Sequence, residues 1–145
     1  MNDLPRTTDA EHPVQVLTEA ECRELLAGAQ LGRLALSRRN EPDIFPVNFW
    51  AHGTTFLVHG PQNVLVAVGR SSQHVALEAD GREAGTVWSV MAKGTVRELD
   101  RPEELEAVRQ RRLRAWILAP DSAFLELSPD KITGRRIAVG PEERY

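Results

Sequence analysis

The sequence predicts a mainly β protein (α+β), an antiparallel split β-barrel of six to eight strands with two or three peripheral helices. Hydrophobic and polar residues alternate with a period of two in many short segments between residues 31 and 139, which is the pattern of half-buried strands. Gly, Pro and Asn residues between these segments indicate turns. Many short strands with few helices favour a Greek-key or split barrel over a sandwich or a doubly wound sheet.

The size of the chain fits one domain. Its 145 residues, 41% of them hydrophobic, are enough to build one ordinary soluble core. We expect this domain to span residues 15–140, between a flexible N-terminal tail at 1–14 and a short C-terminal tail at 141–145.

The first ordered element is expected to be a helix. Thr18 and Glu21 have the spacing of a capping box, and apolar residues follow at helical intervals. Gly32 is expected to stop this helix. Cys22, the single cysteine, falls on the apolar face and is interpreted as a small buried hydrophobic residue in a reducing compartment.

The next segments alternate as strands do. Ile44, Pro46 and Asn48 alternate with Phe45, Val47 and Phe49, after a turn predicted at residues 40–42. Further strands are expected at 54–59, 73–80 and 86–99, with a short apolar segment at 64–68 that could form a helical turn.

The last part of the chain predicts a second helix and two final strands. Asp100 is expected to cap the helix, with Pro102 in its first turn. Its apolar stripe comprises Leu105, Val108, Leu113 and Trp116. The two strands are expected at 124–127 and 132–139.

Three motifs in a fixed order resemble one known family. They are LGRLALSRRNEPDIFPVNFW at 31–50, Trp-Ser-Val at 88–90 and Ile-Thr-Gly-Arg-Arg at 132–136. Together they resemble the flavin-binding split-barrel proteins related to pyridoxamine 5'-phosphate oxidase, over nearly all of residues 15–139. The resemblance implies a homodimer that binds FMN in a cleft between its two subunits.

Carried over residue by residue, the resemblance places two short runs near the flavin: Pro46, Val47, Asn48 and Phe49, then Trp88, Ser89 and Val90. A flavin ring needs hydrogen bonds to its pyrimidine edge, which Asn48 and its flanking amides could give. It also needs apolar cover, which Trp88 or Trp50 could give. The alternative is that Asn48 bonds within the sheet and the tryptophans pack inside the barrel.

The phosphate end of the site departs from the family pattern. Val58-His59 and Asn63-Val64 stand where the family offers an Arg-Thr pair and a Thr-Lys pair to the phosphate. His59, Asn63 and the amides of residues 60–63 could still form a weaker anion site. Arginines elsewhere could replace the missing cations, with Arg135 and Arg136 as first choice, and Arg33 and Arg70 as others.

Several function classes are disfavoured. A net charge of −3 gives no field that attracts nucleic acid or an anionic membrane. The basic run at 109–114 follows three glutamates on the same predicted helix and is interpreted as a solvated helix face. The four histidines lack the spacing of a metal site. No secretory signal or apolar run of roughly 20 residues is found, so we expect a cytoplasmic protein.

These observations lead to one main hypothesis and two alternatives. The main hypothesis is an FMN-dependent oxidoreductase that acts on an unknown small molecule, with the flavin doing the chemistry. The first alternative is a reductase that uses a deazaflavin cofactor. The second is a non-catalytic dimer that binds a ligand after losing flavin chemistry.

Overall fold

The fold is mainly β, as predicted. The computed structural model describes residues 13–61, 63–64, 68, 74–111, 113 and 122–140. Within them, seven strands and two helices follow one another in this order: β1 (Val14–Val16), α1 (Glu19–Gly28), β2 (Leu31–Arg38), β3 (Glu41–His52), β4 (Thr55–Pro61), β5 (His74–Glu83), β6 (Thr86–Glu98), α3 (Pro102–Gln110) and β7 (Ser122–Ala138). Neither described helix is long and apolar enough to cross a membrane.

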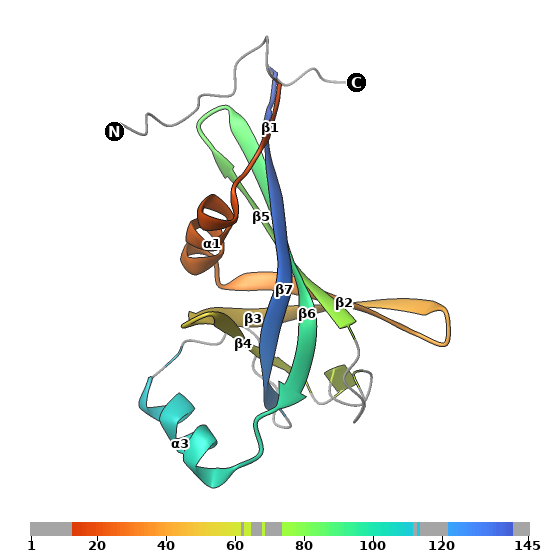
Figure 1. Ribbon diagram of the computed structural model, residues 1–145, viewed down its shortest axis with the longest axis vertical. Helices are drawn as coiled ribbons and strands as arrows, with labels where there is room; N and C mark the ends of the chain where they lie inside the picture. The colour runs from red at the N-terminus through yellow and green to blue at the C-terminus, as the bar shows by residue number, and fades with distance from the viewer. Residues whose placement is uncertain are drawn as a thin grey trace.

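The sheet closes on itself through β7. Its strand order is β1-β7-β4-β3-β2-β5-β6, and β6 pairs back with β7. Residues 122–127 of β7 pair with β4, residues 125–138 pair with β6, and residues 135–137 also pair with β1. Six antiparallel strands therefore form a closed ring, and β1 extends it at one end (Figure 1).

Strand β7 is one long strand, so the prediction of two strands at 124–127 and 132–139 was wrong. Residues 128–131 lie between the two predicted strands, and Ser128, Pro129 and Asp130 among them are typical of turns. In the structure they form an irregularity opposite Lys93 and Gly94, where the register with β6 shifts. A Cβ atom at Gly94 would collide with the carbonyl oxygen of Ser128, so this bulge depends on a glycine across the ladder.

The hairpin of β2 and β3 extends away from the barrel (Figure 1, at the right). Its turn consists of Arg39 and Asn40, one residue earlier than predicted, and both have positive φ angles of 52° and 64°. A two-residue hairpin turn requires such angles because they match the twist of the strands. Residues 37–44 at its tip are exposed on both faces.

Helix α1 begins as predicted and ends earlier. Thr18 and Glu21 form the expected capping box, and Cys22 is fully buried. The helix ends at Gly28, whereas Gly32 lies within β2. A Cβ atom at Gly32 would lie 2.6 Å from the carbonyl oxygen of Glu78, so this glycine permits a close strand approach instead of stopping a helix.

Strand β1 and the N-cap of α3 differ from the prediction. Strand β1 precedes α1, although three residues are too few to show a period-two pattern; it forms by pairing with residues 135–137 of β7. In α3 the N-cap is Arg101 instead of Asp100, and no side chain caps the helix. Pro102 stands in its first turn, as expected.

The described apolar residues form two clusters on opposite faces of the sheet. The first, the barrel core, fills the interior of the ring and includes Leu34, Val47, Phe49, Leu77 and Val90. The second, the α3 cluster, lies between α3 and the outer face of β3, β4 and β7. Its members are Trp50, Leu57, Leu99 and Val108, with Leu105, Leu113 and Phe124 packed against them. Trp116 of the predicted stripe lies outside the described residues.

Candidate functional site

Strand alternation divides the predicted site residues between the two faces of the barrel wall. Val47, Phe49 and Val90 point into the barrel core and are fully buried. Trp88 also belongs to that core. The outward-facing residues are Pro46, Asn48, His59, Ser89 and Arg135, and Asn63 is exposed in the segment after β4. Only alternate members of the two runs can therefore meet a ligand through their side chains.

Four of the outward-facing residues lie on one continuous row across the sheet. Asn48 pairs with His59 on one side and Leu31 on the other, and Asp80 pairs with Ser89, which pairs with Arg135. Strands β2 and β5 pair at residues 33–35 and 76–78, and the same register, continued by two residues, places Leu31 opposite Asp80. We call this set the outer row: His59, Asn48, Leu31, Asp80, Ser89 and Arg135. Because neighbouring strands lie about 4.8 Å apart, Asn48 and Ser89 are separated by about 14 Å along the curved sheet.

Two members of the outer row, Asn48 and His59, are buried, and we call them its covered half. Asn48 and His59 face outward, yet their exposed fractions are 0% and 6%. The His59 ring packs 4.7 Å from the ring of Phe124 and 6.4 Å from that of Trp50. Its Nδ1 atom is buried and has no hydrogen-bond partner among the residues that the structure describes. Burial lowers the pKa of His59, so the ring is neutral at pH 7 and offers one donor and one acceptor.

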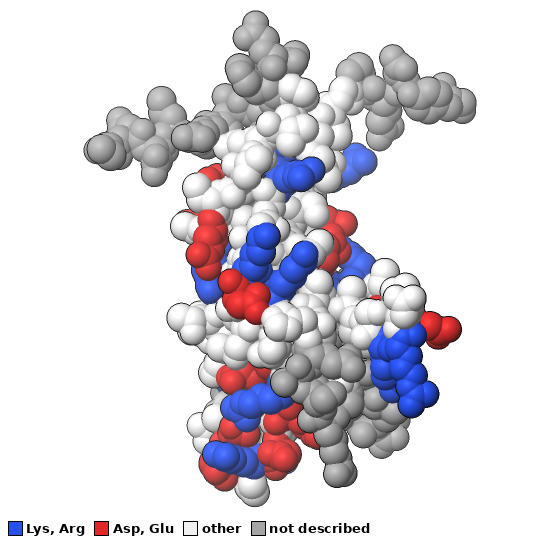
Figure 2. All heavy atoms as spheres, turned by 45° about the vertical axis from the view of Figure 1, so that its right-hand side comes forward, with Lys and Arg blue, Asp and Glu red and all other residues white. Residues whose placement is uncertain are grey.

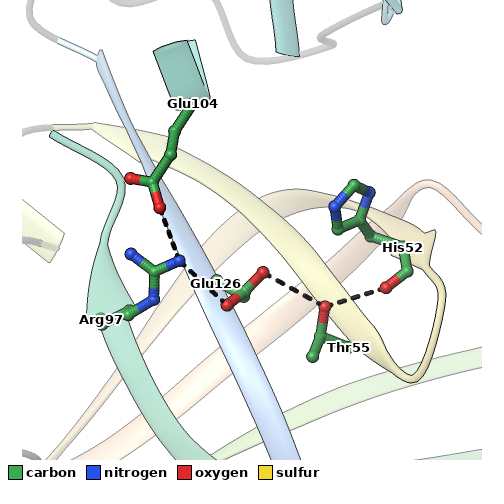
Figure 3. A network of polar contacts seen from close by, with 5 residues as sticks. All are labelled: His52, Thr55, Arg97, Glu104 and Glu126. Carbon is green, nitrogen blue, oxygen red and sulfur yellow. Dashed lines mark hydrogen bonds and ion pairs between the residues drawn. The ribbon is translucent and has the colours of Figure 1, made fainter. Parts of the chain in front are cut away.

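A network of polar contacts ties α3 to the barrel beside this covered half (Figure 3). Arg97 of β6 lies 2.8 Å from a carboxylate oxygen of Glu104 in α3 and 3.3 Å from Glu126 in β7. The Arg97 guanidinium holds the pKa of Glu104 below its usual range. At the far end of the helix, Arg111 donates to the carbonyl oxygen of Ala51. Both ends of α3 are thus held against the strands.

The other half of the outer row is open. Leu31 is 50% exposed, and Ser89 and Arg135 are exposed as well. Arg135 makes no hydrogen bond or ion pair with any residue that the structure describes. A free guanidinium on an exposed strand is available to an anionic ligand.

Arg136 differs from its neighbour. It pairs in register with Trp88, on the opposite face of β7 from Arg135. Its Nη2 atom lies 3.5 Å from a carboxylate oxygen of Glu83, and its side chain is only 18% exposed. Of the two arginines predicted to replace the family's cations, Arg135 is the one that faces the outer row.

Of the two remaining arginine candidates, the one that the structure describes is already paired. Arg33 lies 2.6 Å from Glu78 and 3.1 Å from Asp80, and the hydrogen bond to Glu78 raises its pKa. Its charge is therefore already balanced by two carboxylates. Arg70 lies outside the described residues.

The two positions that depart from the family pattern are parts of the barrel core. Val58 and Val64 are 0% and 1% exposed, and both pack in the main cluster. A Cβ atom at Gly60 would lie 3.2 Å from Val64. Among the described residues, apolar side chains therefore occupy the positions where the family offers cations to the phosphate.

Sequence reasoning missed two members of the outer row, Leu31 and Asp80. Leu31 opens the motif at 31–50 but had no role assigned, and Asp80 belongs to no motif. The place of both residues depends on the pairing of β2 with β3 and of β5 with β6. Leu31 is out of phase with Leu34 and Leu36 in the period-two pattern, a weak sequence signal that could have drawn attention to it. Among the described residues, no three His, Cys, Asp or Glu side chains are arranged to hold a metal ion.

Comparison with known proteins identifies the family. The sequence profile of the pyridoxamine 5'-phosphate oxidase family matches residues 18–136. The chain belongs to this family. It is also 34% identical, over 133 residues and 85% of each chain, to the uncharacterized protein Rv0080 of Mycobacterium tuberculosis.

Solved structures of family members share the fold. A Corynebacterium glutamicum protein, provisionally assigned as a pyridoxamine 5'-phosphate oxidase, is 29% identical with a TM-score of 0.75, covering 89% of this chain and 97% of that one. The FAD binding protein of Mycobacterium smegmatis is 28% identical with a TM-score of 0.72, covering 87% and 100%. These likenesses confirm the predicted split barrel.

Proposed function

We propose that this protein is a flavin-binding oxidoreductase that holds FMN along the outer row and acts on an unknown small molecule. The observation that carries the proposal is the outer row itself, which combines polar, apolar and cationic side chains on one face of a family barrel. The FAD-binding relative from Mycobacterium smegmatis supports a flavin as the cofactor class.

The residues of the outer row fit the chemistry of a flavin nucleotide. The orphaned Nδ1 atom of His59 and the amide of Asn48 would meet the polar edge of the ring. The exposed side chain of Leu31 would give apolar cover. Ser89 and Arg135 would hold the phosphate end, since an arginine fork suits a phosphate.

When bound, the flavin supplies electron-transfer chemistry between a reduced nicotinamide and an acceptor. The chain itself would bind and orient the ring and exclude water. A neutral His59 suits this role because it can donate or accept one hydrogen bond without bringing a buried charge.

We further propose a homodimer, in which a second copy covers the open half of the row. Large apolar side chains are exposed beside that half: Val14, Val16 and Ile137 are 51%, 74% and 39% exposed. They share the outer face of β1 and β7 with Arg135. In Figure 2 the described surface at the upper end of the molecule shows mainly uncharged side chains with some basic ones, and acidic and basic side chains mix further down.

A deazaflavin reductase is the second candidate. The observation that favours it is the burial of Val58 and Val64 in the barrel core. These valines stand where the family offers cationic side chains to the flavin phosphate. A cofactor whose anionic groups lie elsewhere would tolerate that change.

An absorption spectrum of the purified protein tests these proposals. A flavin band, with FMN released on denaturation, supports the main proposal. A colourless protein that quenches the fluorescence of an added deazaflavin supports the second candidate instead. A protein that binds neither cofactor overturns both and leaves a non-catalytic binding dimer.

Replacing Arg135 tests the proposed phosphate contact. We expect Arg135→Gln to weaken FMN binding by more than about tenfold, or 1.4 kcal/mol, because a charge-assisted contact is lost. Fluorescence titration measures the affinity. The control is Arg109→Gln, which removes an exposed arginine of α3 and should leave the affinity unchanged. Equal affinities for wild type and Arg135→Gln would remove Arg135 from the site.

A further inference from the structure

The two lysines of the chain lie directly opposite each other. The sequence has 18 basic residues, of which only Lys93 and Lys131 are lysines. Lys93 of β6 pairs in register with Lys131 of β7, and both side chains are exposed on the outer face. Directly opposed residues of an antiparallel pair have Cβ atoms about 5 Å apart, and like charges there are unfavourable.

The backbone fixes this arrangement. The register shift between β6 and β7 begins immediately after Lys93, and it requires Gly94, since a Cβ atom there would collide with Ser128. Asp130, the extra residue of β7, turns to His74, with 2.8 Å between carboxylate oxygen and ring nitrogen. Bulges commonly redirect side chains next to binding sites.

The carboxylates around the pair are engaged elsewhere. Asp130 contacts His74, and Glu78, which lies on the neighbouring strand β5, contacts Arg33. Neither lysine makes a hydrogen bond or ion pair with a residue that the structure describes. The pair therefore presents two uncompensated positive charges on one small area of the barrel.

We propose that Lys93 and Lys131 form a binding site for the phosphate groups of a small ligand. Lysine ammonium groups act as flexible point charges that can close on one anion from two sides. The exposed hydroxyl of Thr133, two residues along β7 on the same face, adds a donor. Binding of an anion would turn the repulsion between the lysines into attraction to a shared partner.

This site is separate from the proposed flavin contact at Arg135. Lys93 lies four positions from Ser89 along β6, and Lys131 lies four positions from Arg135 along β7. At about 3.3 Å per residue the two positions lie about 13 Å apart. The lysine site goes beyond the proposed flavin function and does not depend on it.

The test is a calorimetric titration of the purified protein with inorganic pyrophosphate at low ionic strength. We expect Lys93→Gln/Lys131→Gln to weaken binding by at least about tenfold relative to wild type. The matched control, Arg101→Gln/Arg109→Gln, removes two exposed charges from the α3 region and should bind like wild type. Equal binding by the lysine variant, or no binding by wild type, overturns the proposal.

Two further measurements sharpen the result. Without pyrophosphate, the lysine variant should melt at the same temperature as wild type or higher, because a like-charge pair has been removed. Arg135→Gln should retain pyrophosphate binding, which separates this site from the flavin proposal. Citrate that binds as tightly as pyrophosphate, through the same lysines, would overturn the assignment to phosphate.

Discussion

The barrel core and the α3 cluster are built from similar residues but differ in how they are closed. The barrel core is enclosed by a ring of paired strands, and its buried members in the described part of the chain are all apolar. Among the residues that the structure describes, the α3 cluster has four buried members, and it relies on ion pairs at its border. The barrel core is held closed by the pairing of its own strands, whereas the α3 cluster stays buried only while one short helix remains in place.

The difference has a functional meaning. Asn48 and His59, the buried polar residues of the described chain, both face outward on the α3 side of the barrel wall. Burying polar groups is costly unless they find partners, and one ring nitrogen of His59 has no partner within the described part of the chain. The buried polar residues therefore lie on the side of the barrel that α3 covers. We expect this side to open most easily, since regions with few apolar contacts unfold locally first.

A matched pair of leucines gives the largest effect. We expect Leu77→Ala, in the barrel core, to lower the free energy of unfolding by about 4 kcal/mol, because the closed ring cannot collapse around the cavity. Leu57→Ala, in the α3 cluster, should cost only about 2 kcal/mol because α3 can settle inward. Both leucines are at most 1% exposed. Urea unfolding followed by circular dichroism measures the two losses, and equal losses would contradict the comparison.

The next effect is a pH dependence that arises from His59. Burial lowers its folded-state pKa from an ordinary value of 6.5, so the unfolded chain takes up a proton first as the pH falls. Stability should therefore be full above pH 6.5 and decline as the pH falls through the folded pKa. His59→Phe keeps an aromatic ring against Phe124 and should flatten this decline.

Thermal melts between pH 5 and 8 measure the dependence. The control His74→Gln removes an exposed imidazole that contacts Asp130 and should keep the wild-type decline. A decline as steep in His59→Phe as in wild type would show that another group causes it.

The barrel could be predicted from the sequence because its inner face follows a simple period. Val75, Leu77 and Ala79 in β5, and Val90 and Ala92 in β6, are buried as the alternation indicates. The continuity of β7 could not be predicted. Ser128-Pro129-Asp130 has the composition of a turn, and only the pairing with Gly94 shows that the strand continues.

The site could be predicted only in part. Family resemblance singled out Asn48 and Ser89 as members of two separate runs, but it did not show which neighbours share their face. That information lies in the register between β3, β2, β5 and β6, which joins residues far apart in the sequence. The same register separates Arg135 from Arg136, which are adjacent in the chain and face opposite sides of the strand.

The smallest effect concerns the contact that holds α3. Glu104→Gln removes the ion pair with Arg97 but leaves the contact between Arg97 and Glu126. We expect amide hydrogens of α3 to exchange several-fold faster, with those of the barrel strands unchanged, because local opening needs less free energy than global unfolding. Arg97 lowers the pKa of Glu104, so this stabilisation is present above the ordinary carboxyl pKa and is lost as the pH falls through the folded value.

The control for this last change is Glu106→Gln, which breaks a 3.4 Å pair with Arg109 on the exposed side of the same helix. Exposed pairs of this kind contribute little, so exchange in α3 should stay near the wild-type rate. Faster exchange throughout the barrel in Glu104→Gln would mean that α3 and the ring unfold as one unit. The covered half of the outer row would then be as permanently closed as the barrel core, and Asn48 and His59 could not receive a cofactor through movement of this helix.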